Sequence, residues 1–437
     1  MKNNEKEFSD LARLISRAVD DRKDEIVNFC QNLIRIPSVT GKEKRIQEYV
    51  AEHLKSMGLE VKVWNPDITR MKDHPGYVDT GKDYINRPNV VGIYRGGGGS
   101  SLIINGHSDV VTPEPLEKWS HHPWGAEIYE NKIYGRGACD MKGGIAGMIK
   151  ALQVLLELNL SPPGDVILEV VVDEEATGNG TLASFLEGYN ADAAIFAEPT
   201  SCEVMPAHRG ALFWRVYVEG KGAHAGVKYK GTSATEKGIL IYDLLRELEN
   251  KRNKRGKRHP LYNCYPLTTP LCVGKFNSGH YPSAVPQECI LEGSIEFLPG
   301  EKVEEVKREF EKTIENVSKK DSWLKKHPPK IEWFGLSLLP AQISPAHPLV
   351  GVFKKAYTEI SGKETKVAGF PSGCDMRIRV LYAGTPSIVF GPGDISLAHR
   401  VDEFILIDEL ILFVKVLALG IVEWGKTKRY RELKCDG

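Results

Sequence analysis

Paired cysteines, an excess of one charge and nucleotide-binding glycine motifs are all missing from this sequence. Eight of its 437 residues are Cys, and none form a Cys-x-x-Cys pair, so neither a structural zinc module nor a redox dithiol is indicated. The glycine run 96–99 lacks the Gly-x-Gly-x-x-Gly fingerprint of a dinucleotide site. Lys+Arg and Asp+Glu both number 58, which gives no support for binding nucleic acid or an acidic membrane.

Long hydrophobic runs are missing as well. The N-terminal segment has neither an apolar stretch of signal-peptide length nor a small-residue cleavage site. The apolar segment 405–422 is interrupted by Asp408, Glu409 and Lys415, which is typical of a buried helix rather than a membrane span. We therefore expect a cytoplasmic protein that does not enter a membrane.

What is present is an alternation of strand-like and helix-like segments. Helical apolar spacing covers 22–57 with a break at 35–41, and helices are predicted over 142–160 and 349–360 and at the C-terminal end. Strand-like runs stand between them at 61–64, 90–94, 102–105, 166–172, 193–196 and 387–390. The run 166–172 is apolar throughout, as in strands that are buried on both faces of a parallel sheet. The pattern predicts an α/β domain with a mainly parallel sheet.

The pattern changes near residue 210. Residues 213–218 alternate like an antiparallel strand, and further strands are predicted at 273–276, 288–297 and 331–334. Helices are predicted over 234–249 and 302–317, with a basic loop at 250–259 that is most simply a solvated loop. We predict that 210–338 is an α+β unit inserted into the larger domain, which consists of 1–209 and 339–437.

Candidate metal ligands follow the predicted strands of the larger domain. They are His107, Asp109, Asp140, Glu174, Glu175, Glu198 and His399. Since ligands of open α/β sheets collect at the carboxyl ends of the strands, we expect these side chains to converge. Taken singly, each has a simpler explanation: a histidine after a strand as a satisfied polar residue, Asp140 as a helix cap, and the glutamate pair as a solvated strand end. The prediction depends on all of them occurring together.

The residue types indicate which metal is bound. Two histidines and several carboxylates suit zinc, with Co²⁺ or Mn²⁺ as substitutes. One carboxylate can bridge two ions, each completed by a histidine and another carboxylate, as in hydrolytic two-metal sites. One further carboxylate would then remain as a general base.

At this point the motifs resemble a known family. The blocks Gly106-His107-Ser108-Asp109-Val110, 135–144, Asp173-Glu174-Glu175 and Ala197-Glu198-Pro199-Thr200 are similar to those of the zinc-dependent acetylornithine deacetylase, succinyl-diaminopimelate desuccinylase, aminoacylase and carboxypeptidase G family. The resemblance runs from 36–41 to 398–403. It implies a two-zinc amide hydrolase in which 210–338 is a lid that commonly pairs two subunits.

The resemblance also implies a role for each residue. His107 and Glu198 would hold one zinc, Glu175 and His399 the other, and Asp140 would bridge them. Asp109 would accept the other ring N–H of His107 and fix its tautomer, and Glu174 would be the general base. His224, in Gly220-Lys221-Gly222-Ala223-His224-Ala225-Gly226, matches a lid histidine that reaches the partner subunit's active site, where it would stabilise the oxyanion.

Some positions depart from the family pattern. Glu296 stands where many relatives carry an Arg that binds a substrate carboxylate, and Ser283 stands where they carry Asn. A lid of this kind is closer to a branch that includes a formylaminopyrimidine deformylase, whose substrate has no carboxylate. Arg377 matches a segment near the substrate and is either an anion contact or part of a structural salt bridge. Cys139 is read as a small buried residue, and His121 and His122 as surface or packing residues.

The function predicted from these residues is removal of an acyl group from a small N-acyl amine or amino acid. A metallo-dipeptidase or carboxypeptidase with the same metal centre is the alternative among enzymes, because both also cut an amide. A non-catalytic metal-binding relative is the alternative from another class. We expect a homodimer that pairs through the lid, a small-molecule substrate, and no nucleic-acid or membrane partner.

Overall fold

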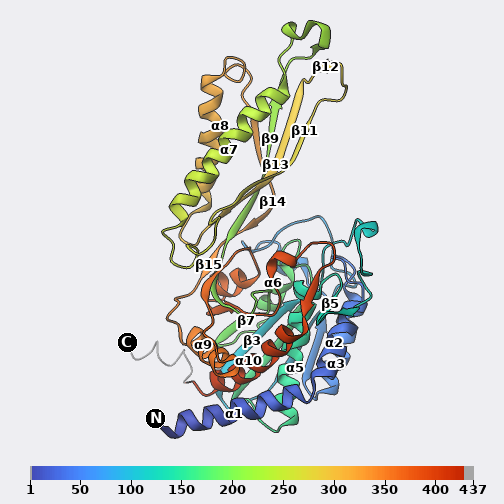
Figure 1. The fold of residues 1–437 in the computed structure, drawn as a ribbon, viewed down its shortest axis with the longest axis vertical. Coiled ribbons are helices and arrows are strands. Elements are labelled where there is room, and N and C mark those ends of the chain that lie inside the picture. Colours follow the sequence, from blue (N-terminus) through green and yellow to red (C-terminus); the bar gives the residue numbers. More distant parts are fainter. Residues whose placement is uncertain (1, 428–437) are drawn as a thin grey trace. The chain divides into compact units, whose positions relative to one another are not determined.

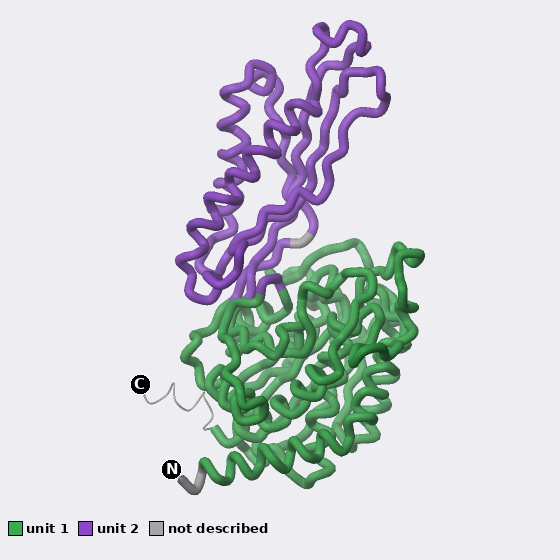
Figure 2. Tube along the Cα trace, in the orientation of Figure 1, with its two compact units in different colours: residues 1–207, 342–370, 374–437 green, residues 208–341, 371–373 purple. Residues whose placement is uncertain are grey.

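The computed structural model describes residues 2–427 and divides the chain into two compact units (Figure 2). Unit 1 contains 1–207, 342–370 and 374–437, and unit 2 contains 208–341 and 371–373. The borders expected from the sequence, after 209 and after 338, lie beside these, whereas the small contribution of 371–373 to unit 2 was not expected. Cys435 lies outside the described residues.

Unit 1 is built on a nine-stranded sheet with the order β1-β2-β6-β3-β7-β17-β8-β15, in which β16 pairs with β8 (Figure 1). Its strands are β1 (Glu60–Trp64), β2 (Asn89–Tyr94), β3 (Gly99–His107), β6 (Gly164–Val171), β7 (Ala193–Phe196), β8 (Val204–His208), β15 (Ala341–Gln342), β16 (Val367–Phe370) and β17 (Ser387–Val389). The central strands β6, β3, β7 and β17 are parallel, while β1, β2 and β8 are antiparallel to their neighbours. The fold is therefore α/β as predicted, and its sheet is mixed with a parallel centre.

Helices cover both faces of this sheet. The helices of unit 1 are α1 (Lys2–Asp20), α2 (Lys23–Arg35), α3 (Lys44–Ser56), α4 (Ile68–Met71), α5 (Gly143–Glu157), α6 (Asn179–Leu186), α9 (Pro348–Ser361) and α10 (Ile407–Gly425). Neighbouring residues of one strand belong to different apolar clusters: Leu168 packs with α5 and α10, and Ile167 packs in the cluster on the opposite face. Burial on both faces explains why the central strands are apolar throughout.

Short elements complete unit 1. They are β4 (Ile128–Tyr129), β5 (Lys132–Tyr134) and β18 (Phe404–Leu406), which form a three-stranded sheet, and the single turns η1 (Leu116–Lys118), η2 (Ala138–Lys142), η4 (Ile378–Tyr382) and η5 (Ile395–Leu397). None of the helices in the described part of the chain has the length and apolar character that crossing a membrane requires. The cytoplasmic location expected from the sequence stays a prediction.

Unit 2 is an antiparallel sheet with two helices on one face (Figure 1). It contains β9 (Gly210–Glu219), β10 (Ala223–His224), η3 (Ala225–Lys230), α7 (Ala234–Gly256), β11 (Leu271–Ser278), β12 (Ala284–Val285), β13 (Glu288–Phe297), α8 (Val303–Lys320) and β14 (Lys330–Leu338). The main sheet has the order β11-β13-β9-β14, and β10 pairs with β12 separately. Trp214 and Val216 of β9 pack under the helices, while Phe213 and Tyr217 point to the exposed face.

The basic loop predicted at 250–259 is wrong, because α7 continues to Gly256. Arg252 is buried, and its guanidinium lies 2.9 Å from Glu309 Oε2 of α8 and 3.2 Å from Glu301 Oε2. Arg255 pairs with the same two glutamates. Ion pairs with Glu301 and Glu309 therefore allow α7 to continue through residues whose high polarity, in the sequence alone, predicted a loop.

One buried ion pair on the central sheet yields a stability prediction. Glu169 of β6 is fully buried among apolar neighbours, and its carboxylate accepts hydrogen bonds from Arg379, Ser184 and Asn105. Replacing Arg379 by Met leaves that charge uncompensated, so we expect the free energy of unfolding to fall by about 3–5 kcal/mol in urea denaturation. The matched control is Arg13→Met, whose exposed pair with Asp10 should contribute less than about 1 kcal/mol. An equal effect of the two substitutions would contradict the prediction.

Candidate metal centre

The candidate site lies at the carboxyl edge of the parallel strands in unit 1. Its six side chains come from separate segments: His107 ends β3, Glu174 and Glu175 follow β6, Glu198 follows β7, Asp140 lies in η2 before α5, and His399 lies between η5 and β18. Because parallel strands end at a common edge, segments far apart in the sequence meet there. The structure brings all the predicted ligands and the predicted base together.

Asp140 lies between the two histidines. Its Oδ1 is 3.0 Å from His107 Nε2, and its Oδ2 is 3.5 Å from His399 Nε2. Since each carboxylate oxygen faces a different imidazole, the one side chain is placed to contact two ions at once. Asp140 is 7% exposed, so little water competes for its oxygens.

The glutamates divide between the same two histidines. Glu198 Oε2 is 3.7 Å and Glu174 Oε2 is 3.9 Å from His107 Nε2, and Glu175 Oε2 is 2.9 Å from His399 Nε2. The ligand atoms of His107, Glu174 and Glu198 all lie within 4.8 Å of one another. The same holds for those of His107, Asp140 and Glu175.

The contacts of Asp109 differ from those expected. His107 Nδ1 donates to the main-chain carbonyl of Asp109 at 2.9 Å, while the Asp109 carboxylate is 3.7 Å from that nitrogen. The carboxylate instead accepts hydrogen bonds from the backbone N–H groups of Glu174, at 3.1 Å, and Glu175, at 3.3 Å. Asp109 therefore holds the His107 tautomer through its backbone and the glutamate pair through its side chain.

The site concentrates negative charge in a buried space. Burial raises the pKa of Glu198 to about 7, and it raises the pKa of Glu174 well above its usual range against the opposing charge of His107. Burial alone would lower the pKa of His107, but the charge of Glu198 and the hydrogen bond with Asp140 raise it well above the usual value. The hydrogen bond with Glu175 raises the pKa of His399 to about 9.

The donor set fits divalent cations. His107 Nδ1 donates its hydrogen to a carbonyl, so Nε2 is left to face the carboxylates as a ligand. The remaining donors are carboxylate oxygens, which with imidazole nitrogen suit zinc, cobalt or manganese. A cation would also replace the protons that the crowded carboxylates otherwise hold.

Sequence reasoning missed two groups of residues that support this edge. Arg87 is buried and donates to Glu43 at 2.6 Å and to Asp173 at 2.6 Å, directly beside Glu174. Glu403 accepts hydrogen bonds from the backbone around Asp140. Glu403 belongs to the block 398–403 that carries the family resemblance, so the sequence could have indicated that it lies near the site. Arg87 stands alone before a proline, and no motif in the sequence marks it as a residue that supports the site.

The predicted lid residues lie in unit 2. His224 ends β10, which pairs with β12 as a two-stranded sheet in which His224 lies opposite Ala284, and Ser283 immediately precedes β12. His224 is exposed, and its Nδ1 accepts a hydrogen bond from Gly226 N at 3.2 Å. The neutral ring therefore carries its hydrogen on Nε2, which can donate.

Glu296 is paired within unit 2. Its Oε2 accepts a hydrogen bond from Arg209 Nη1 at 2.8 Å, and the Arg209 guanidinium lies 5.5 Å from the centroid of the Tyr262 ring and 5.4 Å from that of the Tyr265 ring. Arg209 also donates to the main-chain carbonyls of Pro371 and Leu267. The guanidinium of Arg209 is thus occupied by groups of the protein itself.

Arg377 forms the salt bridge that was one of its two interpretations. Its guanidinium is buried and donates to Asp375 Oδ1 at 2.8 Å and to the carbonyl of Thr177 at 2.7 Å. Contact with a substrate anion stays a prediction. Cys139 is buried and its Sγ lies 3.2 Å from Asp394 O, as expected of a small packed residue.

The remaining histidines near the site have local partners. His121 stacks on Tyr134 with ring centroids 4.0 Å apart and lies 2.9 Å from Glu127. His122 Nδ1 accepts a hydrogen bond from Trp124 N at 3.2 Å. These contacts agree with packing roles rather than metal binding.

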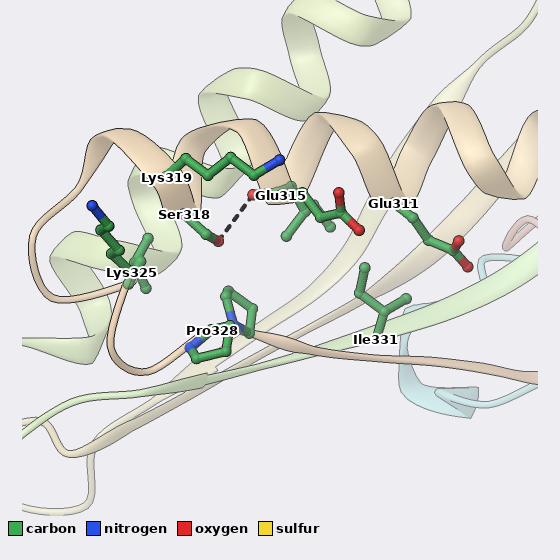
Figure 3. Close-up of a pocket in the computed structure, with 10 residues that line it drawn as sticks. Glu311, Glu315, Ser318, Lys319, Lys325, Pro328 and Ile331 are labelled. Carbon is green, nitrogen blue, oxygen red and sulfur yellow. Dashed lines mark hydrogen bonds between the residues drawn. The ribbon is translucent and has the colours of Figure 1, made fainter.

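A separate hollow of about 480 Å³ lies in unit 2 between α8 and the segment before β14 (Figure 3). Ile314, Leu324 and Ile331 line it together with the charged side chains of α8. None of the predicted site residues lines this hollow.

Comparison with known proteins identifies relatives of the whole chain. The model of the family described as peptidase family M20/M25/M40 matches residues 103–422. A protein of Halalkalibacterium halodurans named N-formyl-4-amino-5-aminomethyl-2-methylpyrimidine deformylase is 31% identical over 93% of this chain and 96% of its own. The Bacillus subtilis protein of the same name is 28% identical over 95% of this chain and 98% of its own.

Solved structures show the same fold at lower identity. Human carnosine dipeptidase 1 superposes with a TM-score of 0.72 and 17% identity, covering 95% of this chain and 99% of that one. A Sulfolobus solfataricus metallo-carboxypeptidase gives a TM-score of 0.71 with 17% identity, covering 92% of this chain and 100% of that one. The family expected from the sequence motifs is confirmed.

The geometry of Asp140 yields a metal-binding prediction. Zinc added to the metal-free protein should raise its Tm, because an ion that binds only the folded state stabilises it. Asp140→Ala removes the carboxylate between the two histidines, so most of this rise should disappear in differential scanning calorimetry. Asp79→Ala, at an exposed loop position, should keep the full rise. An undiminished rise in the Asp140 variant would show that Asp140 is not a ligand.

Proposed function

The chain belongs to peptidase family M20/M25/M40, whose members hydrolyse amide bonds. From this premise, we propose that the protein removes a small acyl group from the nitrogen of a small amine, and that the preferred acyl group is formyl. The observation that carries the proposal is the position of Asp140 between His107 and His399, with the Glu174 carboxylate at the same site. A metal pair and a base at one place are one arrangement that hydrolyses unactivated amides.

We infer that two zinc ions are held by this cluster. His107 and Glu198 would hold one ion and Glu175 and His399 the other, since each glutamate lies beside its histidine. Asp140 would contact both ions. When bound, such ions supply positive charge that lowers the pKa of water and polarises a carbonyl group.

Glu174 is proposed as the group that moves the proton. Its side chain is only 15% exposed and its Oε2 lies 3.9 Å from His107 Nε2, and Asp109 fixes its backbone N–H. Glu174 would accept a proton from the attacking water and hand it to the departing amine nitrogen.

His224 is proposed to stabilise the negative charge that develops on the amide oxygen. The hydrogen bond from Gly226 keeps the ring hydrogen on Nε2, and the ring is exposed, so this N–H is free to donate outward. By resemblance to the family, it would do so at the active site of a partner subunit.

Two exposed features of unit 2 support a dimer. Strand β11 is an edge of the main sheet, and an edge strand presents backbone groups that can pair with another chain. Beside it, α7 exposes Ile239 by 49% and Tyr242 by 37%. A hollow of about 360 Å³ lies between them, lined by Tyr242, Leu267 and Val273 among others. We propose that a second copy of the chain pairs along this edge.

The pairing of Glu296 with Arg209 favours an amine without a carboxylate. An anionic substrate would gain from a cation at this position of the lid, where many relatives carry Arg. Here Glu296 supplies the opposite charge and Arg209 is already neutralised by it. Ser283 can offer only a hydroxyl in place of the usual amide. The two relatives named as deformylases of an aminopyrimidine agree with this preference.

A substrate panel tests the proposal. Zinc-loaded protein is offered N-formyl, N-acetyl and N-succinyl derivatives of a heteroaromatic methylamine, the same acyl groups on α-amino acids, and dipeptides, and the released amine is measured. We expect the N-formyl amine without a carboxylate to give the highest kcat/KM. A preference for dipeptides would favour the dipeptidase alternative, and no release from any compound would contradict the proposed activity.

Two inactive variants test the shared site. Glu174→Gln should bind zinc but lose turnover by orders of magnitude, and His224→Ala should lower kcat about 10²–10³-fold. A heterodimer of the two, purified through different tags, contains one site with both groups intact and should regain about half of the wild-type rate. His280→Ala, at another exposed lid histidine, is the control and should remain active. A heterodimer as inactive as its parents would contradict action across subunits.

A further inference from the structure

Glu403 binds the backbone from which the bridging carboxylate extends. Its Oε1 accepts hydrogen bonds from the N–H groups of Cys139, at 2.9 Å, and Asp140, at 3.0 Å. The side chain is 1% exposed, so no water substitutes for these bonds. One carboxylate oxygen therefore fixes the two consecutive peptide units on either side of Cys139, the second of which leads into Asp140.

The second oxygen of Glu403 is held by a cation. Arg136 Nη1 donates to Glu403 Oε2 at 2.6 Å, and Arg136 is itself only 3% exposed. The guanidinium lies 5.2 Å from the centroid of the Trp119 ring. The charge of Glu403 is thus compensated by Arg136, and it does not add an unpaired anion beside Asp140.

Glu403 also connects two ligand-bearing segments. It stands four residues after His399 and immediately before β18, and its main-chain carbonyl accepts a hydrogen bond from Gly135 N at 2.8 Å. The segment that carries His399 is therefore tied to the segment that carries Asp140. Without such a tie, repulsion from the neighbouring glutamates would push the Asp140 segment away from its place in the site in the absence of ions.

We propose that Glu403, compensated by Arg136, is a positioning residue that fixes Asp140 and His399 before the metal pair binds. The inference rests on the proposed function, since it assumes that Asp140 bridges two ions. Ions that meet a prearranged set of ligands do not have to order the loops, so their affinity is higher. Partners that orient metal ligands typically contribute 10–100-fold to affinity.

The chemistry of Glu403 makes one substitution informative. Glu403→Gln keeps the size of the side chain but replaces one oxygen by an NH₂ group. That group must face either the guanidinium of Arg136 or the N–H groups of Cys139 and Asp140, and all of these are donors. The amide cannot satisfy both sides, so the Asp140 segment should loosen while the packing around it keeps its volume.

Asp402 provides the matched control. Its Oδ1 also accepts hydrogen bonds from two consecutive backbone N–H groups, those of Ser120 at 2.8 Å and His121 at 3.2 Å. These belong to the loop before β4 and not to the Asp140 segment. Asp402→Asn therefore makes the same change from carboxylate to amide one residue away, where the remaining oxygen can still accept both hydrogen bonds, without touching the bridging ligand.

Zinc affinity is measured on the full-length wild type, Glu403→Gln and Asp402→Asn by competition with a chromophoric chelator, and the Tm of each metal-free protein is recorded. We expect Glu403→Gln to lower the affinity for both ions by about 10–100-fold and Asp402→Asn to leave it within about threefold of the wild type. An equal loss in both variants, a loss confined to one ion, or no loss would overturn the inference.

A second pair of variants decides the outcome if Glu403→Gln does not fold. Arg136→Lys keeps a cation beside Glu403 and should retain more zinc affinity than Arg136→Met, which leaves Glu403 unpaired. Equal affinities in these two would overturn the inference. If the wild type takes up no zinc, the proposed function is overturned together with the positioning role. If the wild type binds zinc but the variants behave alike, only the positioning role of Glu403 is overturned.

Discussion

Repulsion between crowded carboxylates is the constraint on which the active edge of unit 1 depends. Asp140, Glu174, Glu175 and Glu198 each have an oxygen 2.9–3.9 Å from the Nε2 atom of His107 or His399. Four carboxylates gathered around the same two rings cannot all remain charged without a counter-charge. The cluster therefore favours the binding of cations. The surrounding structure must hold the carboxylate side chains in place against the repulsion between them.

Two sets of residues hold the ligands in place: those at the ends of the strands and the buried charged groups behind them. Parallel strands bring His107, Glu175 and Glu198 to one edge, because each segment leaves the sheet in the same direction. Behind them lie charged groups that are paired with one another rather than with solvent, such as Arg87 with Asp173. Asp109 joins the layers, since its carbonyl holds the His107 ring and its carboxylate holds the backbone of the glutamate pair.

Unit 2 contributes chemistry of a different kind. Its core forms when α7 and α8 cover one face of an antiparallel sheet, and β11 remains an edge strand while β10 and β12 pair separately from the main sheet. Strand β10 carries the exposed His224 with its ring hydrogen fixed on Nε2, and the main sheet carries Glu296 already paired with Arg209. Metal chemistry in unit 1 is thus separated from substrate discrimination and subunit pairing, which are proposed for unit 2.

The sequence by itself determined the fold class, and it indicated which side chains meet at the edge of the sheet and where a second unit begins. These follow from local signals: residues of metal-binding type placed directly after apolar strands, and a change from continuous to alternating apolar patterns near residue 210. Only the tertiary structure decided which atom of Asp109 contacts His107, that Arg252 extends α7, and that Glu403 and Arg87 support the site. These features depend on partners distant in the chain, as with Glu403 and Asp140, and local patterns do not report which distant groups will meet.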